Sequence, residues 1–471
     1  MSLLLSQKHK KIGIFGLGKT GVSSYEALYK VAQVICYDQN NVSRKAFSEI
    51  YGNDKLVDLS DPRWKKLDKI VLSPGVSLSH DIVKLAASNN ILLTSDIELL
   101  FEEAKSVNFV AVTGTNGKST TVALIGYILQ TQGRHYPIGG NIGIPALSID
   151  FHAPGYVLEL SSFQLDLLQN FKAKIAILLN ITKDHLARHG SMENYIASKR
   201  KICDRLDKES FAIISVDNEI TKQFLEQLEI ENRTNLLPIS TRKILDKGAS
   251  VYHNIIYDNI AEPLIWRLPN NKYLLGSHNQ ENIIASYAAC RILGIKPEEI
   301  ITAITEFKGL PHRMQYIGTI YSDDTHVSNN HNFDSNGRRE VNFYNDSKAT
   351  NTDAASKSLT ALDNIYWLAG GIAKEGGIAG LEPLFHKIRK AYLFGQDKEM
   401  FAATLDKKVQ YQICEDLTEA FNMAMQDAQT DGKAVKNILL APACASFDQF
   451  KNFEERGELF IKLYNIAVHR S

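Results

Sequence analysis

The chain has 471 residues, which is too long for one ordinary core and predicts three domains of roughly 100–200 residues each. Its composition, 44% hydrophobic and 23% charged, is typical of globular proteins rather than disordered chains. Lys plus Arg and Asp plus Glu both total 53, so the chain has no net basic charge with which to neutralise nucleic-acid phosphates or an anionic membrane.

The N-terminal apolar run is too short for a signal peptide, and no later run approaches the length of a membrane span. We therefore expect a soluble, cytoplasmic protein without membrane insertion. The five cysteines are scattered and lack the paired spacing of metal ligands, so structural thiols in a reducing compartment are the better interpretation.

The first predicted unit, residues 1–97, begins with a strand at 12–15, a glycine-rich turn, a helix, and a strand at 34–37. The pattern Gly16-x-Gly18-x-x-Gly21 with Asp38 after the second strand matches the dinucleotide fingerprint, which alone would suggest a nicotinamide-dependent oxidoreductase. The pattern is weak by itself, because such a turn can hold any diphosphate. Further strands are expected at 69–72 and 91–93, before an acidic helix at 96–105.

The second predicted unit, residues 98–308, opens with a strand at 109–112 that leads into Thr113-Gly-Thr-Asn-Gly-Lys-Ser-Thr-Thr121 and then an apolar helix. In this position the backbone N–H groups and the helix N-terminus predict a polyphosphate site. Lys118 would reach the terminal phosphates, and Ser119, or less readily Thr120, would offer a hydroxyl to Mg²⁺. The first glycine of the usual phosphate loop is missing.

Strands expected at 156–160, 175–179 and 211–215 alternate with helical stretches, which is the pattern of a parallel sheet covered on both faces. Glu159 and His185 follow two of these strands, so both are expected at the carboxyl edge of the sheet, beside the phosphate loop. Each is a candidate Mg²⁺ ligand, directly or through water.

The third predicted unit, residues 309–471, has strands near 365–369, 391–394 and 437–441. A polar run at about 318–342 is expected to be an inserted surface loop or a hairpin tip. Its histidines, His326 and His331, fit solvated side chains better than metal ligands.

Several motifs of the second unit resemble the ATPase core of the Mur ligases. They are the phosphate loop, Gly139-Gly-Asn141-Ile-Gly143, Glu159-Leu-Ser-Ser-Phe-Gln, Asn180-Ile-Thr-Lys-Asp-His185 and His278-Asn279-Gln-Glu-Asn282. The third unit is similar to the branch of that family that adds D-glutamate, in Leu310-Pro-His-Arg313, Asn345-Asp-Ser-Lys348-Ala-Thr350 and the stretch from Ala441 to Gly457. The resemblance implies an α/β fold of three domains in series: a Rossmann-like domain, a phosphate-loop ATPase and a second Rossmann-like domain.

The resemblance also implies a reaction. A substrate carboxylate attacks the γ-phosphate of ATP, and D-glutamate then attacks the acyl phosphate to form an amide in peptidoglycan precursor synthesis. Lys118, Glu159, His185 and Lys199 would be catalytic, with Lys199 carbamylated so that its ammonium becomes a carboxylate-like metal ligand. Two Mg²⁺ ions are implied, held among Ser119, Glu159, His185 and Lys199.

Three binding sites are implied on the same basis. ATP would contact Gly114, Thr115, Asn116, Gly117, Lys118, Ser119, Thr120, Asn279, Asn282, Arg313 and Asp346. UDP-N-acetylmuramoyl-L-alanine would contact Gly18, Lys19, Thr20, Asp38, Ser73, Pro74, Gly75, Asn141 and His185. D-Glutamate would contact Lys348, Thr350, Lys374, Ser446 and Phe453. A monomer that binds no nucleic acid is expected.

The chain departs from the family pattern at Ala187, at Gln39-Asn40 and at Ala373. A folate-type polyglutamate ligase shares the ATPase plan and is the nearest alternative, although it would not predict a uridine-binding first domain. A degenerate, non-catalytic scaffold is disfavoured, because Lys118, Glu159, His185 and Lys199 are all present.

Overall fold

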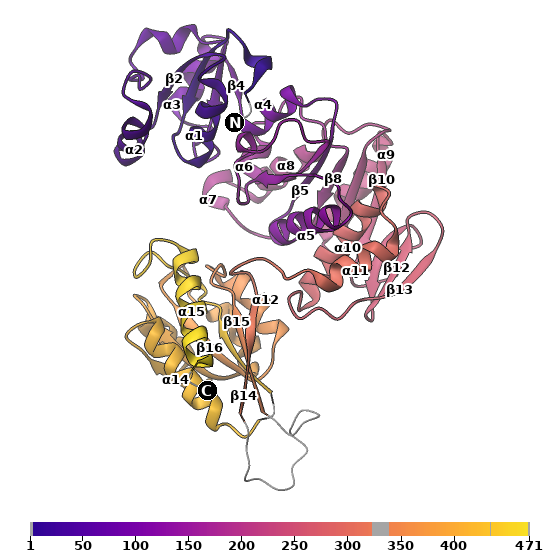
Figure 1. Cartoon of the computed structure of the whole chain (residues 1–471), viewed down its shortest axis with the longest axis vertical. Helices are drawn as coiled ribbons and strands as arrows, with labels where there is room; N and C mark the ends of the chain where they lie inside the picture. Colours follow the sequence, from indigo (N-terminus) through magenta and orange to yellow (C-terminus); the bar gives the residue numbers. More distant parts are fainter. Residues whose placement is uncertain (1–2, 323–338, 434, 470–471) are drawn as a thin grey trace. The chain divides into compact units, whose positions relative to one another are not determined.

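The computed structural model describes residues 3–322, 339–433 and 435–469. These residues form three large β-sheets that follow one another along the chain, each accompanied by helices (Figure 1), which confirms the predicted α/β class with three domains in series. The chain divides into two compact units, Met1–Pro269 with Glu281–Thr305, and Asn270–Gln280 with Glu306–Ser471. The first two sheets belong to the first unit and the third to the second. The exact boundaries after residues 97 and 308 stay predictions.

The first sheet is fully parallel, in the order β2-β1-β3-β4. Its strands coincide closely with the four that the sequence predicts, because their apolar runs are buried: all of β3 and the last four residues of β1. The elements are β1 (Lys11–Phe15), β2 (Gln33–Tyr37), β3 (Lys69–Leu72), β4 (Leu92–Thr94), α1 (Lys19–Leu28), α2 (Asn41–Tyr51), α3 (Asp81–Ser88) and α4 (Asp96–Glu103), with short helices η1 (Leu5–Gln7) and η2 (Pro62–Lys66).

The second sheet has nine strands in the order β13-β12-β11-β10-β9-β8-β5-β7-β6. The strands from β11 to β6 are parallel, and β12 and β13 add an antiparallel edge that the sequence analysis did not predict. The strands are β5 (Asn108–Thr113), β6 (Ile138–Gly140), β7 (Gly155–Glu159), β8 (Ile175–Leu178), β9 (Phe211–Ser215), β10 (Asn235–Ser240), β11 (Gly248–Tyr252), β12 (Ile255–Asn259) and β13 (Leu264–Arg267).

The helices that follow these strands include the one that begins at the phosphate loop. They are α5 (Lys118–Thr131), η3 (Ala146–Ser148), α6 (Ser162–Leu165), α7 (Leu186–His189), α8 (Met192–Arg200), η4 (Lys201–Cys203), α9 (Glu219–Glu231), α10 (Ser277–Ile292) and α11 (Pro297–Glu306). Because β5, β7 and β8 are parallel neighbours, their carboxyl ends meet at one edge, where the sequence predicts the phosphate site.

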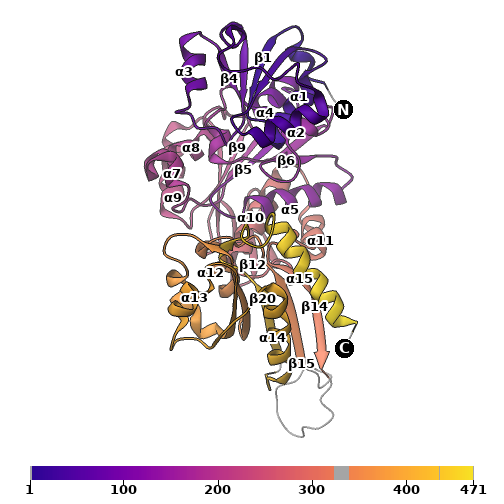
Figure 2. The same cartoon turned by 90° about the vertical axis from the view of Figure 1, so that its left-hand side faces the viewer.

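The third sheet has the order β14-β15-β20-β16-β18-β19, with only β14 antiparallel to its neighbour. Helices α14 and α15 pack on one face (Figures 1 and 2), and α12, α13 and η5 pack on the other. The elements are β14 (Gln315–Ser322), β15 (Arg339–Asn345), α12 (Thr352–Ala361), β16 (Ile365–Gly370), β17 (Ile372–Ala373), η5 (Ala379–Lys387), β18 (Ile388–Phe394), α13 (Lys398–Leu405), β19 (Tyr411–Ile413), α14 (Leu417–Thr430), β20 (Val435–Leu440), β21 (Cys444–Ala445) and α15 (Phe453–Val468).

Both ends of the polar run at 318–342 are strand residues of the β14–β15 hairpin rather than loop. The middle of the run, including His326 and His331, lies outside the described residues.

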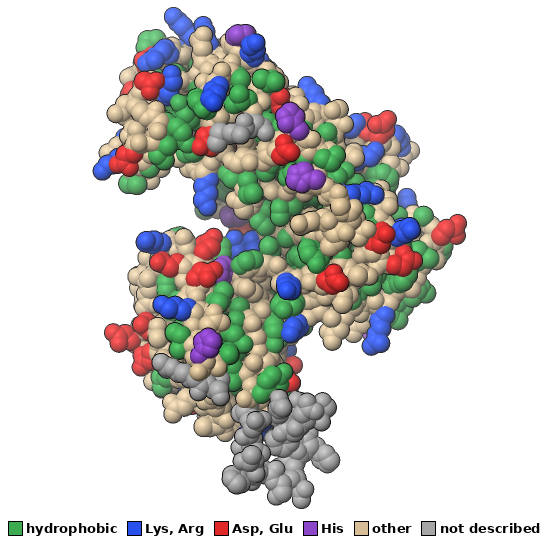
Figure 3. Space-filling model, viewed as in Figure 1, with side chains coloured by type: hydrophobic (Ala, Val, Ile, Leu, Met, Phe, Trp, Pro, Cys, Tyr) green, Lys and Arg blue, Asp and Glu red, His purple; other side chains and the backbone are tan. Residues whose placement is uncertain are grey.

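Basic and acidic side chains are interspersed on the face of the molecule that Figure 3 shows, which agrees with the equal numbers of the two charges. In the part of the chain that the structure describes, no helix combines the length and the apolar character that crossing a membrane requires. All five cysteines are buried free thiols, as the sequence predicts.

A buried carboxylate ties α4 to the second sheet. Glu98, which is 2% exposed, accepts hydrogen bonds from the backbone N–H groups of Gln169 (3.1 Å), Asn170 (2.7 Å) and Phe171 (3.2 Å), just before β8. Removing the carboxylate takes away the acceptor that these three donors share, and unsatisfied buried donors are costly.

We therefore expect Glu98→Ala to lower the free energy of unfolding by about 3 kcal/mol. Urea unfolding would measure this loss. Glu103→Ala on the same helix is the matched control, because Glu103 accepts only one exposed backbone hydrogen bond, from Ser6, among the contacts described. Equal losses in the two variants would contradict the role given to Glu98.

Candidate functional site

The phosphate loop lies between β5 and α5. Gly114 and Gly117 have φ angles of +155° and +85°, a region that favours glycine, and Gly117 is the N-cap of α5 without a side-chain cap. Asn180, after β8, accepts a hydrogen bond from the Thr115 N–H at its carbonyl (2.8 Å) and from the Asn116 N–H at its Oδ1 (2.9 Å). The loop is thus held in place while the N-terminus of α5 is directed to its concave side, as phosphate binding requires.

Gly117 also has no room for a side chain. A Cβ atom there would lie 2.2 Å from Oδ1 of Asn282, and the φ angle adds strain of about 1–2 kcal/mol. We expect Gly117→Ala to weaken ATP binding at least about tenfold. Gly133→Ala is the control, because Gly133 has φ +67° but open space around its Cα. Titration calorimetry with ATP would test this; unchanged affinity would show that the loop tolerates the displacement.

Two lysines converge on the same loop. Nζ of Lys118 donates to the carbonyl oxygens of Gly114 and Thr115, both at 2.9 Å, and Nζ of Lys199 donates to the Gly114 carbonyl at 2.8 Å. Lys199 is only 2% exposed. Burial, followed by repulsion from Lys118, lowers the pKa of Lys199 well below its ordinary value. The loop therefore brings together Lys118, which is predicted to bind phosphate, and a second lysine whose pKa is lowered.

Glu159 is hydrogen-bonded to two other predicted site residues. Its buried carboxylate accepts a hydrogen bond from Oγ of Ser119 (2.5 Å) and one from Nδ2 of Asn141 (2.7 Å). A hydroxyl beside a carboxylate at the phosphate loop is a donor set that suits Mg²⁺, which prefers oxygen ligands and keeps several waters. The structure therefore brings together Ser119 and Glu159, two of the residues predicted to hold Mg²⁺.

His185 lies further along the same edge. It begins α7 with φ +53°, its side chain is half-exposed, Nε2 lies 3.3 Å from Oδ2 of Asp184, and its ring packs beside that of Phe163. Within the described ranges, no three His, Cys, Asp or Glu side chains are grouped closely enough to hold a metal ion. The residues predicted to bind two metals do not form a complete protein cage, so water, phosphate oxygens or a modified Lys199 would have to complete the coordination.

In the first sheet, Asp38 holds the glycine-rich turn. Its Oδ2 accepts from the Leu17 N–H (2.5 Å) and its Oδ1 from the Asn40 N–H (2.7 Å). A Cβ atom on Gly21 would lie 1.8 Å from the Gly16 carbonyl oxygen, so the third glycine allows a close backbone approach. Oγ of Ser73 donates to the same carbonyl at 2.9 Å. Asp38 and Ser73 therefore shape the turn that was predicted to bind a diphosphate.

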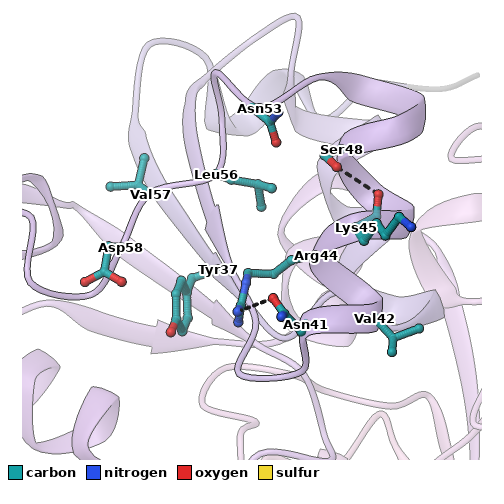
Figure 4. Close-up of a pocket in the computed structure, with 10 residues that line it drawn as sticks. All are labelled: Tyr37, Asn41, Val42, Arg44, Lys45, Ser48, Asn53, Leu56, Val57 and Asp58. Atoms are coloured by element: carbon teal, nitrogen blue, oxygen red, sulfur yellow. Dashed lines mark hydrogen bonds between the residues drawn. The ribbon is translucent and has the colours of Figure 1, made fainter.

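A pocket of about 650 Å³ lies beside the end of β2. In Figure 4, Tyr37, Asn41 and Arg44 lie together at one end of it. The Arg44 guanidinium donates to the Asp38 carbonyl and to Oδ1 of Asn41 (2.6 Å), and lies 5.3 Å from the centre of the Tyr37 ring. Sequence reasoning missed Arg44, since nothing in the glycine motif points to the first turns of α2.

Arg188 links the first two sheets and was also missed. It donates to the carbonyl of Val76 and approaches that of Gly75 at 3.5 Å, and its guanidinium lies 4.9 Å from the centre of the Phe163 ring. The loop predicted to line the UDP-substrate site is thereby joined to the segment that contains His185. In the sequence, the one feature that pointed to Arg188 was its position directly after Ala187, where the chain departs from the family pattern.

In the second unit, four of the residues predicted to bind D-glutamate lie beyond the carboxyl ends of the parallel neighbours β15, β20 and β16. Lys348 comes after β15, and its Nζ lies 4.3 Å from the centre of the Phe453 ring. Lys374 follows β17 and is exposed, whereas Ser446 follows β21 and is buried. Because β17 pairs with β21, these two segments are adjacent, and Thr350 lies in the loop after Lys348.

Other predicted ATP ligands are engaged within their own units. Asp346 is buried and accepts hydrogen bonds from the Met314 N–H (3.1 Å) and from Oγ of Ser358, and burial raises the pKa of its carboxyl group. Nδ2 of Asn279 donates to the Leu275 carbonyl (2.8 Å), and Asn282 accepts from Oγ1 of Thr121 (3.3 Å). Arg313 stands just before Met314. Through Thr121, Asn282 contacts the helix that follows the phosphate loop.

Comparison with known proteins places these features in a family. Residues 112–290 match the Mur ligase middle domain. The chain is 54% identical to the UDP-N-acetylmuramoylalanine–D-glutamate ligase of Rickettsia bellii, over 97% of this chain and 98% of that protein.

Two solved structures share the fold. UDP-N-acetylmuramate-alanine ligase MurC from Thermotoga maritima matches with a TM-score of 0.57 and 17% identity. The match covers 98% of this chain and 100% of that chain. MurF ligase from Thermotoga maritima in complex with ADP has a TM-score of 0.57 and 16% identity, covering 99% and 100% of the two chains.

Proposed function

This chain belongs to the Mur ligase family, and we propose that it joins D-glutamate to UDP-N-acetylmuramoyl-L-alanine with cleavage of ATP to ADP and phosphate. The step would supply a cytoplasmic precursor of peptidoglycan. The observation that carries the proposal is similarity to a D-glutamate ligase over nearly the whole chain rather than over the ATPase domain alone. A folate-type ligase is disfavoured, because the similarity includes the first sheet.

The geometry of the phosphate loop supports the ATP half of the reaction. Lys118 and the N-terminus of α5 would bind the terminal phosphates, and Ser119 and Glu159 would hold Mg²⁺, which supplies charge neutralisation when it is bound. The remaining catalytic need is positioning, so that the substrate carboxylate meets the γ-phosphate in line. No covalent enzyme nucleophile is required.

We propose that Lys199 is carbamylated. Its lowered pKa favours the neutral amine, whose nitrogen can attack the carbon of CO₂; an N–C bond forms, one C=O bond opens to a carboxylate, and the nitrogen loses a proton to water. The product would replace a buried amine with an anion beside the phosphate loop. With His185, that anion would bind a second Mg²⁺.

The substrate sites follow the three sheets. The uridine nucleotide would bind at Gly18, Lys19, Thr20 and the Ser73-Pro74-Gly75 loop, with Asp38 acting through the shape of the turn and Asn141 and His185 meeting the muramoyl end. D-Glutamate carries two carboxylates, which Lys348 and Lys374 suit as cations, with Thr350, Ser446 and Phe453 completing the pocket. We retain Asn279, Arg313 and Asp346 as ATP ligands, residues 1–97, 98–308 and 309–471 as the domains, and a monomer as the functional form.

The test is phosphate release by purified protein with ATP, Mg²⁺ and UDP-N-acetylmuramoyl-L-alanine, with D-glutamate, L-glutamate or L-lysine in separate reactions. We expect release only with D-glutamate. Stimulation by L-lysine instead, or by L-glutamate with a folate as the acid substrate, would contradict the proposal and identify the alternative.

A further inference from the structure

Arg456 is an arginine buried in the second unit without a carboxylate partner. It lies in the first turns of α15 and is 0% exposed. Across the described residues its guanidinium forms no ion pair, and the groups it contacts are neutral oxygens. Burial lowers its pKa to about 10, so it is still a cation at neutral pH. A buried cation is expensive unless its hydrogen bonds are satisfied, which gives these contacts particular weight.

The acceptors come from three separate strand ends. Nε donates to Oγ of Ser347 (3.0 Å), and Nη2 donates to the carbonyls of Ser347 (2.8 Å) and Cys444 (3.1 Å). Nη1 donates to the carbonyl of Gly370 at 3.4 Å. Ser347 follows β15, Gly370 ends β16, and Cys444 begins β21 after β20. Because the sheet order is β15-β20-β16, one guanidinium connects three adjacent carboxyl ends.

Each of these acceptors lies within four residues of a proposed D-glutamate ligand. Lys348 directly follows Ser347, Ser446 lies just beyond Cys444, and Lys374 lies in the segment after Gly370. Oγ of Ser347 also donates to the carbonyl of Phe453 at 2.8 Å. The side chains proposed to bind the two carboxylates of the amino acid are thus spaced by loops that share one buried centre.

The backbone around this centre has little freedom to adjust. A Cβ atom on Gly371 would lie 2.2 Å from the Ala445 carbonyl oxygen, so the segments of Lys374 and Ser446 pack backbone against backbone. Nδ2 of Asn345 donates to the Gly457 carbonyl (3.0 Å), which fixes the start of α15 against β15. A planar guanidinium can satisfy acceptors in three directions at once, and a lysine ammonium on a flexible stem cannot reproduce that fork.

We propose that Arg456 is a positioning residue for the amino-acid substrate: it sets the spacing of the loops that carry Lys348, Lys374 and Ser446 without touching the substrate itself. This inference rests on the proposed function for the identity of the amino acid. It predicts an effect mainly on D-glutamate, because the phosphate loop and the glycine-rich turn belong to the other unit, and because Asp346 is held by Met314 and Ser358 rather than by Arg456.

The test compares Arg456→Lys with Arg389→Lys. Arg389→Lys is the same substitution at a different place, the start of β18. Arg389 is half-exposed there and lies 3.4 Å from Asp431. We expect Arg456→Lys to raise KM for D-glutamate at least about tenfold and to change KM for ATP and the UDP-substrate by less than about twofold. Arg389→Lys should leave all three unchanged. Melting temperatures would show whether each variant is folded.

The outcomes separate this inference from the proposed function. If neither the unmodified protein nor Arg389→Lys releases phosphate in response to D-glutamate, the proposed function is contradicted. Suppose that the control is active and Arg456→Lys is folded. The positioning role is then overturned if the KM of Arg456→Lys for D-glutamate is unchanged, or if its KM values for all three substrates rise in proportion. If Arg456→Lys does not fold, Ser347→Ala decides, because it removes one acceptor and keeps the guanidinium: a selective rise in D-glutamate KM supports the inference, and no selective rise overturns it.

Discussion

Replacing Lys199 with alanine should reduce ligase turnover by roughly a hundredfold or more, the range seen when a group that stabilises transition-state charge is lost. The side chain is almost fully buried and its Nζ contacts the Gly114 carbonyl, so the variant removes a group at the predicted phosphate loop rather than a surface charge. Initial rates of phosphate release would measure the loss, with circular dichroism to confirm that the variant is folded.

Chemical rescue of Lys199→Ala tests whether Lys199 acts as a carbamate. If Lys199 acts as a carbamate, a short carboxylic acid added to Lys199→Ala should restore part of the activity by occupying the space of the lost carboxylate. Lys201→Ala is the matched control, since Lys201 lies just beyond α8 and pairs with Asp166 on a more exposed part of the surface. Near-normal turnover in Lys199→Ala would show that the buried lysine is structural.

Lys118→Ala should abolish measurable turnover while the fold persists. In the structure Lys118 is partly buried and its Nζ donates to the backbone carbonyls of Gly114 and Thr115 in its own loop, so we expect the fold to survive its loss. Charge on the transferring phosphoryl group would then lack its nearest protein cation. ATP binding by calorimetry and single-turnover rates would separate a binding defect from a chemical one.

Lys118→Arg is the informative companion variant, because it keeps the charge but not the compact ammonium that fits the loop. We expect it to regain little activity, and Lys208→Ala, at an exposed lysine that bonds Asn232, to retain all of it. Substantial turnover in Lys118→Ala would contradict the phosphate role.

The strand–turn–helix elements proposed to bind phosphates were predictable because their signals are local. A buried strand, a glycine-rich turn and a helix start within a few residues of one another, and the structure confirms this order at β1–α1 and at β5–α5. The carboxyl-edge placement of Glu159 followed from the same rule, since parallel strands bring their ends together.

Features that depend on distant contacts were not predictable. Arg456 is 109 residues from Ser347, and no local pattern distinguishes it from a surface arginine of a helix. The hydrogen bonds by which Asp38 holds the Leu17 and Asn40 N–H groups were not predicted either, and its contact with the UDP-substrate stays a prediction. The antiparallel edge at β12 and β13 was missed because β13 is short and half-exposed, so its apolar signal is weak.

The measurement that tests the account most directly is the fate of a labelled carboxylate oxygen. UDP-N-acetylmuramoyl-L-alanine carrying a heavy oxygen isotope in its carboxylate would be turned over with ATP and D-glutamate, and the released phosphate analysed by mass spectrometry. An acyl-phosphate ligase transfers one labelled oxygen to each phosphate, and only when D-glutamate is present does amide accumulate. Phosphate without label, released as ATP is cleaved, would mean that water attacks the γ-phosphate, which would contradict the proposed ligation.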